Sequence, residues 1–168
     1  MLQVEAIHVS CDKLRKLAVL GGTGDQGSAL ALRWALAGHQ VTLGSRLAER
    51  ACKVADQLNK QHDGAKLQGA GNRDAASAAD VVILTVPFSA QSATVEEVRE
   101  VLDGKILIDV TVPLVPPKVA RVQLPDGGSA VVNIQKLLGN SVRVVSAFQN
   151  VSAQHLKNID GPIDCDVL

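Results

Sequence analysis

The sequence predicts a single α/β domain of Rossmann type, in which helices cover both faces of a doubly wound parallel sheet. The apolar run 17–20 breaks directly into Gly22-x-Gly24-x-x-Gly27, and a small, apolar segment of helical length follows as far as Gly38. Strand, glycine turn and helix in this order are typical of a dinucleotide-binding unit. Further on, the run 81–86 is rich in β-branched residues, as expected for a strand buried on both faces.

Strands and helices alternate along the rest of the chain, which favours right-handed crossovers and the strand order 3-2-1-4-5-6. Gly38 ends the first helix, Pro87 ends the fourth strand, and Ser129 and Gly139 bracket the last helix. The expected strands are 17–20, 40–43, 67–69, 81–86, 106–110 and 142–145, and the expected helices are 25–37, 47–60, 74–79, 89–102 and 129–138.

Three segments fall outside this alternation. Residues 1–16 have no clear period, so we expect a poorly ordered leader before a dinucleotide-binding domain of residues 17–168. Residues 111–128 contain a cluster of prolines and no period, which predicts a long functional loop at the mouth of a substrate site. Residues 163–168 have the composition of the beginning of another strand.

The composition argues against several classes of protein. The 168 residues carry 17 basic and 17 acidic side chains without a basic stripe, so nothing points to nucleic acid or to a membrane surface. No apolar run approaches the roughly 20 residues of a membrane span. The three cysteines and four histidines are scattered, which predicts reduced thiols in a cytoplasmic protein and no metal site.

Each glycine of the motif is expected to have its own role. Gly22 allows the tight turn out of the strand, Gly24 lets a pyrophosphate approach the backbone, and Gly27 lets the helix lie close to the sheet. The free N–H groups and the positive dipole end of the following helix then face the phosphate charge. The alternative interpretation is a plain tight turn.

The junction after the second predicted strand selects the cofactor. An NAD site has a carboxylate about 20 residues beyond the glycines, where it holds the ribose 2′-hydroxyl. Here Ser45 and Arg46 take that place, with Arg50 one turn further on. A guanidinium pairs with a 2′-phosphate through two parallel hydrogen bonds, so we predict NADP(H). In the alternative, Ser45 only caps the following helix and Arg46 is solvated.

Two further segments follow predicted strands, at the edge of the sheet where doubly wound folds bind ligands. Phe88 comes after the fourth strand, and we expect it either to contact cofactor or substrate or only to pack a loop. The polar segment 147–152 comes after the sixth strand. It is suited to hydrogen-bonding a carboxamide or a flat heterocycle, or else to capping a short helix.

Five motifs carry more than a generic signal, because they occur in order at matching spacings. Together they resemble the NADPH-dependent reductases of the 8-hydroxy-5-deazaflavin coenzyme F-420 (also written F420), over about residues 17–168. The resemblance implies reversible hydride transfer between NADP(H) and the deazaflavin, a homodimer, and C-terminal helices that complete the substrate pocket; we expect this chain to lack that helical part. The motifs are Leu-Gly-Gly-Thr-Gly-Asp-Gln-Gly (20–27), Gly-Ser-Arg (44–46), Leu-Thr-Val-Pro (84–87), Val-Pro-Leu-Val-Pro (112–116) and Val-Ser-Ala-Phe-Gln-Asn-Val (145–151).

The resemblance also implies roles for individual residues. They fall into a pyrophosphate loop, a 2′-phosphate pocket, a stretch along the cofactor and a segment near the nicotinamide. Together with the motif glycines and Phe88, the expected cofactor-binding set is Gly22, Thr23, Gly24, Asp25, Gln26 and Gly27 in the loop, Ser45, Arg46 and Arg50 at the 2′-phosphate, Val86, Pro87 and Phe88 along the cofactor, and Asn150 and Val151 near the nicotinamide.

No paired carboxylates, Ser/His/Asp set or Cys/His pair is evident in the sequence, so no catalytic side chain is predicted. Hydride transfer between two heterocycles needs positioning rather than a protein nucleophile. The sequence therefore predicts an NADP-dependent oxidoreductase acting on coenzyme F-420. Two alternatives stay open: a reductase with another acceptor, such as an imine or a flavin, and a non-catalytic NADP-binding module.

Overall fold

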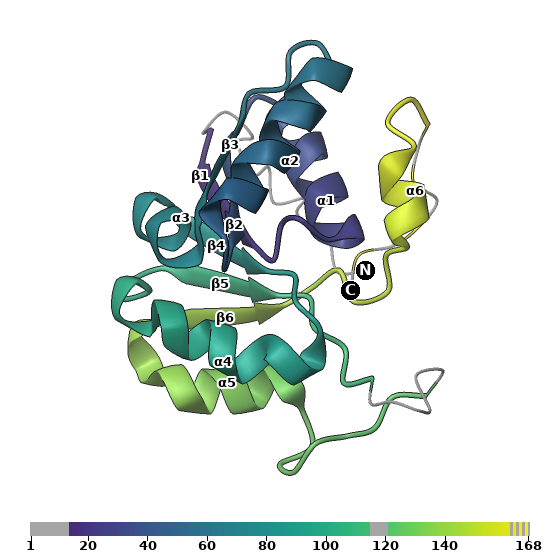
Figure 1. Ribbon diagram of the computed structural model, residues 1–168. Coiled ribbons are helices and arrows are strands. Elements are labelled where there is room, and N and C mark those ends of the chain that lie inside the picture. The colour runs from purple at the N-terminus through teal and green to yellow at the C-terminus, as the bar shows by residue number, and fades with distance from the viewer. Residues whose placement is uncertain (1–13, 115–120, 162, 164, 166, 168) are drawn as a thin grey trace, which may run out of the picture.

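The computed structural model describes residues 14–114, 121–161, 163, 165 and 167. Six parallel strands form one sheet in the order β3-β2-β1-β4-β5-β6, so the predicted fold class and strand order are confirmed (Figure 1). Leu20 in the central strand lies opposite Gly44 on one side and Leu84 on the other. The strands are β1 (Lys16–Leu20), β2 (Gln40–Ser45), β3 (Leu67–Gly71), β4 (Val81–Leu84), β5 (Ile106–Asp109) and β6 (Arg143–Ser146).

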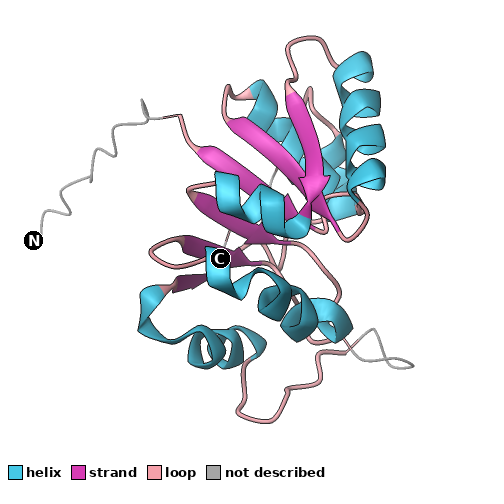
Figure 2. Cartoon of the chain, turned by 60° about the vertical axis from the view of Figure 1, so that its left-hand side comes forward, coloured by secondary structure: helices cyan, strands magenta, loops and turns pink. Residues whose placement is uncertain are grey.

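Helices cover both faces of this sheet, as Figure 2 shows. On one face lie α1 (Asp25–Leu36) and α2 (Ala48–Gln61), and on the other lie α3 (Asn72–Ala78), α4 (Phe88–Val98) and α5 (Ala130–Leu138). The short helix α6 (Ala153–Lys157) packs against α1 instead of the sheet. Among the described helices, none is long and apolar enough to cross a bilayer.

Two aliphatic clusters hold the layers together, one on each side of the sheet. Val19 and Ile83 pack toward α1 and α2, whereas their neighbours Leu20 and Leu84 pack toward α3, α4 and α5. Because successive residues of a strand point to opposite faces, β1 and β4 are buried on both sides. Their unbroken apolar sequences predicted this central position.

Several element ends differ from the prediction. β4 ends at Leu84 and not at residue 86, because its partner β1 ends at Leu20, where the chain turns. β2 and β3 each run two residues further than expected, because they pair with each other as far as Ser45 and Gly71. The helix predicted over 89–102 is α-helical only to Val98 and then tightens into a 3₁₀ turn, Arg99–Val101.

The predictions for the ends of the chain concern residues that fall largely outside the described part of the structure. The description begins at Leu14, and β1 already starts at Lys16, inside the predicted leader 1–16. Of the closing strand predicted for 163–168, the residues 163, 165 and 167 are described and form no strand. Residues 115–120 of the long loop are also outside the description, whereas Leu114 and Val122 on either side of them form an isolated antiparallel bridge.

Candidate functional site

The turn between β1 and α1 needs glycine at two neighbouring positions for different reasons. Gly21, one residue ahead of the motif, has a φ of 72°, so the left-handed residue of the tight turn is Gly21, whereas the turn was predicted at Gly22. Gly22 instead permits close packing. A Cβ at Gly22 would lie 2.6 Å from the carbonyl oxygen of Val19 and 2.8 Å from the side chain of Leu43.

Gly27 and Gly24 differ in what surrounds them. A Cβ at Gly27 would collide with the hydroxyl of Thr85, so this glycine allows α1 to lie against the sheet, as expected. A Cβ at Gly24 would meet only the carbonyl oxygen of Gly21, at 3.5 Å, which is an ordinary contact. The fold itself therefore does not require glycine at position 24. Close approach of a ligand to this exposed backbone is the physical reason that remains.

The first turn of α1 offers backbone N–H groups at the carboxyl edge of the sheet, while its side chains reach toward the C-terminal part of the chain. The carboxylate of Asp25 pairs with Nζ of Lys157 on α6 at 2.7 Å. The hydrogen bond and the charge of Lys157 hold the pKa of Asp25 below its ordinary value of 3.8. Gln26 donates its side-chain amide to the carbonyl oxygen of Phe148 at 3.0 Å.

The end of β2 carries cationic side chains. The Ser45 hydroxyl accepts a hydrogen bond from the N–H of Leu47 at 3.2 Å, so it supports the turn into α2, although Leu47 and not Ser45 is the N-cap residue. The side chains of Arg46 and Arg50 are exposed, and in the described part of the chain neither guanidinium forms an ion pair with a carboxylate. Both charges are therefore available to an anionic ligand.

A hollow of about 330 Å³ at the carboxyl edge joins the glycine turn, the end of β2 and the start of α4. It brings together seven of the predicted residues, and no carboxylate is among the described residues that line it. Its lining is Gly21, Thr23, Gly24, Ser45, Arg46, Arg50, Asn72, Thr85, Val86, Pro87, Ala90 and Thr94. The predicted residues Gly22, Asp25, Gln26, Gly27, Phe88, Asn150 and Val151 do not line it.

Asn72 lines this hollow but was not among the residues predicted to bind the cofactor. It is 3% exposed, and its amide nitrogen donates to the Glu97 carboxylate at 3.1 Å. Its Oδ1 atom is buried and has no hydrogen-bond partner in the described structure. An unpaired buried acceptor costs about 1–3 kcal/mol, so a ligand donor here would be stabilising. The available signal was its place near the carboxyl end of a predicted strand, but that strand was predicted to end at residue 69 and the next helix to begin at residue 74.

A second hollow, of about 390 Å³, lies beyond the ends of β5 and β6. Asn150 and Gln149 line it, together with parts of the long loop such as Thr111 and Pro113. Val151 is buried beneath this surface against α1, where it packs with Leu30. The described parts of the loop predicted at the substrate mouth thus border a depression, whereas Val151 is buried and does not line it.

A buried carboxylate supports the edge between the two hollows. Asp109 at the end of β5 is fully buried, and its carboxylate accepts hydrogen bonds from the Gln91 amide at 2.6 Å and from the Thr111 N–H at 2.9 Å. The Asp109 carbonyl oxygen accepts a further bond from Gln149 at 2.8 Å. This network fixes the long loop and the segment after β6 to the same strand end.

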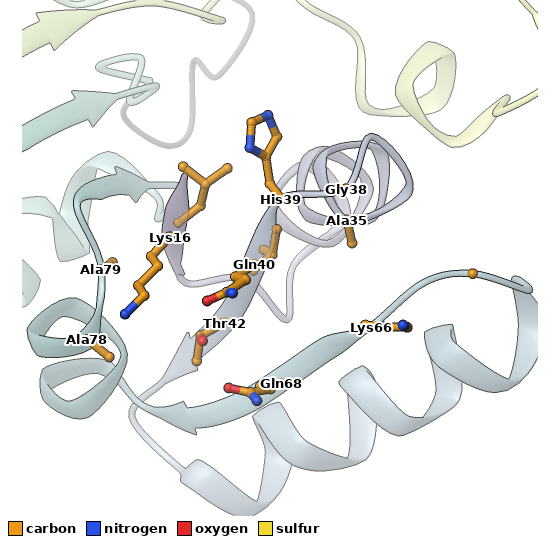
Figure 3. Close-up of a pocket in the computed structure, with 13 residues that line it drawn as sticks. Lys16, Ala35, Gly38, His39, Gln40, Thr42, Lys66, Gln68, Ala78 and Ala79 are labelled. Carbon is orange, nitrogen blue, oxygen red and sulfur yellow. The ribbon is translucent and has the colours of Figure 1, made fainter. Parts of the chain in front are cut away.

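Other features of the surface are less suited to a dinucleotide. A hollow of about 620 Å³ lies at the amino ends of β1, β2 and β3. Lys16, Gln40, Thr42 and Gln68 project from the strands into this region (Figure 3). Ligands of doubly wound sheets bind at the opposite, carboxyl edge. No group of three or more metal-ligating side chains occurs within the described residues.

Comparison with known proteins agrees with this geometry. The family model described as "NADP oxidoreductase coenzyme F420-dependent" matches residues 16–113. A protein of Methanothermobacter marburgensis named F420-dependent NADP reductase is 48% identical over 159 residues, which are 91% of this chain and 71% of that protein. A protein of the same name from Methanocaldococcus jannaschii is 43% identical over 160 residues, with the same coverage of 91% and 71%.

Solved structures support the fold. An imine reductase from Bacillus cereus aligns with a TM-score of 0.57 at 24% identity, covering 83% of this chain and 42% of its own. A pyrroline-5-carboxylate reductase from Coxiella burnetii aligns with a TM-score of 0.56 at 20% identity, covering 81% and 44%. The family match and the relatives, taken with the glycine turn and the arginines beyond β2, identify this chain as a member of the coenzyme F420-dependent NADP oxidoreductase family.

Proposed function

We propose that this chain is an oxidoreductase that transfers a hydride reversibly between NADP(H) and the deazaflavin coenzyme F420. The family and the names of the relatives support both partners. The observation that carries the choice of NADP(H) is the pair of unpaired guanidiniums, Arg46 and Arg50, in a hollow whose described lining contains no carboxylate. A 2′-phosphate would bind there by charge-assisted hydrogen bonds, with Ser45 as a third donor.

The chain offers three further features that fit NADP(H). The N–H groups of residues 25–27 and the open backbone at Gly24 would hold the pyrophosphate. The unpaired Oδ1 of Asn72 would accept a hydrogen bond from the adenosine half. Thr23, Val86 and Pro87 would line the path of the cofactor, with Gly22 and Gly27 shaping the turn beneath it. Phe88 would also lie along the cofactor, and Asn150 and Val151 complete the proposed binding set near the nicotinamide.

The protein's own part in the reaction is positional, and we assign no catalytic side chain. When bound, the two cofactors supply a hydride donor and a hydride acceptor. The chain has to hold the reacting carbons about 3–3.5 Å apart and exclude water. The network around Asp109 serves this purpose, because it fixes the two loops that border the second hollow.

The direct test mixes the purified chain with NADPH and oxidised coenzyme F420 and follows both absorbances. We expect equimolar loss of NADPH and of oxidised deazaflavin, and the reverse reaction with NADP⁺ and reduced deazaflavin. A folded chain that binds NADPH but gives no turnover would refute the activity. Turnover with an imine or a flavin in place of the deazaflavin would redirect it to another acceptor.

We further propose a homodimer that works in the cytoplasm. Large apolar side chains are exposed around the second hollow and on the edge strand: Val122 is 55% exposed, Leu124 74% and Val145 43%. Exposed apolar surface of this kind favours association. Within the described residues, Cys52 and Cys165 form no disulfide, which favours a reducing compartment. Sedimentation equilibrium tests the dimer, and a purely monomeric protein at micromolar concentration would exclude it.

A further inference from the structure

Among the described residues, Phe148 is the one non-glycine residue with a positive φ, 66°. Bulky residues rarely adopt this left-handed conformation, because the Cβ atom crowds the backbone carbonyl oxygen. Such a conformation persists only where the surroundings hold it, and it is concentrated at functional sites. Phe148 lies two residues beyond the end of β6, at the carboxyl edge of the sheet.

Two contacts from α1 hold Phe148 in place. The Gln26 amide donates to the Phe148 carbonyl oxygen at 3.0 Å, in a partly buried position. The ring of Trp34 meets the ring of Phe148 edge to face, with centroids 5.8 Å apart and planes at 75°. The N–H of Val151 donates to the same carbonyl oxygen at 3.3 Å, so Gln26 acts on the turn that follows Phe148.

The residues after Phe148 are anchored at both sides. Gln149 donates to the Asp109 carbonyl oxygen at 2.8 Å, which ties the segment to the end of β5. Val151 is buried against Ala29 and Leu30 of α1. The segment 148–151 therefore bridges β5 and α1, and Asn150 lies between the two anchors on the wall of the second hollow.

This segment lies on the path that a dinucleotide takes across a doubly wound sheet. The pyrophosphate meets the N-terminus of the first helix, and the two nucleotide halves extend to opposite sides of it. Since Arg46 and Arg50 lie past β2, the nicotinamide half extends toward β5 and β6, where the segment 148–151 is found. Gln26, the second residue of α1, connects the pyrophosphate end to that segment with one side chain.

We propose that Gln26 is a positioning residue for hydride transfer. Its amide keeps the Phe148 backbone in the left-handed conformation and thereby sets where the segment 148–151 borders the nicotinamide. The proposal rests on the proposed function, because it assigns the nicotinamide half to this side of the site. Gln26 does not touch the reacting atoms. Without its amide the turn at Phe148 relaxes, and a displacement of about 1 Å is enough to cost on the order of a hundredfold in rate.

The test is the substitution Gln26→Met, which removes the donor and keeps the length of the side chain. We expect single-turnover hydride transfer at saturating NADPH and coenzyme F420 to slow by roughly tenfold to a hundredfold. The Kd for NADPH should stay within about threefold, since the backbone N–H groups are unchanged. The matched control is Gln154→Met on α6, whose exposed side chain should tolerate the change with an unaltered rate.

A second readout needs no turnover. Trp34 is the single tryptophan of the chain, and it contacts Phe148, so acrylamide quenching of its fluorescence reports on this contact. We expect stronger quenching in Gln26→Met and wild-type quenching in Gln154→Met. Unchanged quenching and rate in Gln26→Met, or a fall in rate matched by an equal loss of NADPH affinity, would overturn the positioning role. A wild-type chain without turnover would overturn the proposed function instead. In that case the quenching of Trp34 in Gln26→Met still tests whether Gln26 holds Phe148 against Trp34, and unchanged quenching would show that it does not.

Discussion

Arg46→Ala should weaken the binding of NADPH and leave the binding of NADH nearly unchanged. The guanidinium of Arg46 has no carboxylate partner in the described structure, so its removal leaves no buried charge behind. The lost interaction is a charge-assisted hydrogen bond, which contributes about 1.5–3 kcal/mol. At about 1.4 kcal/mol for each factor of ten, the Kd for NADPH should rise by roughly 10- to 100-fold.

The geometry of the site refines this magnitude. Arg50 lines the same hollow and would share the 2′-phosphate, so the double variant should lose more than Arg46→Ala but less than the sum of the single losses. Arg46→Lys keeps the charge and loses the paired hydrogen bonds, and we expect an intermediate Kd. Lys53→Ala, on the exposed surface of α2 outside this hollow, is the matched control for a lost cation.

Isothermal titration with NADPH and with NADH, at low and at physiological ionic strength, measures both the affinity and its salt dependence. The difference between wild type and Arg46→Ala should shrink as salt screens the exposed cation. Equal losses for the two cofactors would show that Arg46 does not contact the 2′-phosphate. A loss of similar size in Lys53→Ala would reduce the effect to general electrostatic attraction.

Three further changes test other parts of the site. Gly24→Ala should lower NADPH affinity without lowering the melting temperature, because the new Cβ would make only an ordinary contact with the protein. Gly22→Ala should lower the melting temperature, because its Cβ would collide with the carbonyl oxygen of Val19. Asp109→Ala should lower the free energy of unfolding in urea by about 2–4 kcal/mol, since two buried donors lose their acceptor. Lys157→Met should reduce the free energy of unfolding at pH values above the ordinary Asp25 pKa of 3.8, because Asp25 is then ionised and loses its partner. The difference from wild type should vanish as the pH falls through the lowered pKa of Asp25. A difference that stays constant at all pH values would contradict this.

The sheet was predictable because its signals are local. The apolar runs that become β1 and β4 identified the centre of the sheet, and the glycine turn identified the first crossover. The same turn also has a feature that the sequence motif did not predict. The motif predicted the tight turn at Gly22, but the left-handed residue is Gly21. Gly22 is required by the packing of Leu43 against it, and a linear pattern does not show this contact.

The polar part of the site was less predictable, because it depends on contacts between distant residues. Asn72 became visible only when β3 proved longer than expected and carried it to the edge of the hollow. The pair of Gln91 and Asp109 joins two elements whose sequences read as an amphipathic helix and an apolar strand. Nothing in the local sequence of Phe148 indicates a positive φ, since the contacts that hold it come from α1.

The two ends of the site are built on different physical principles, and this difference follows from what each end has to do. Discrimination of a 2′-phosphate needs cations that can pair with its oxygens, and the side chains of Arg46 and Arg50 are exposed and have no carboxylate partner among the described residues. Hydride transfer depends on sub-ångström placement, which mobile surface side chains cannot supply. On that side the chain uses a fully buried carboxylate and a strained residue held from α1. Substitutions at the arginines should therefore act on cofactor affinity, and substitutions around Asp109 and Phe148 on the rate of transfer.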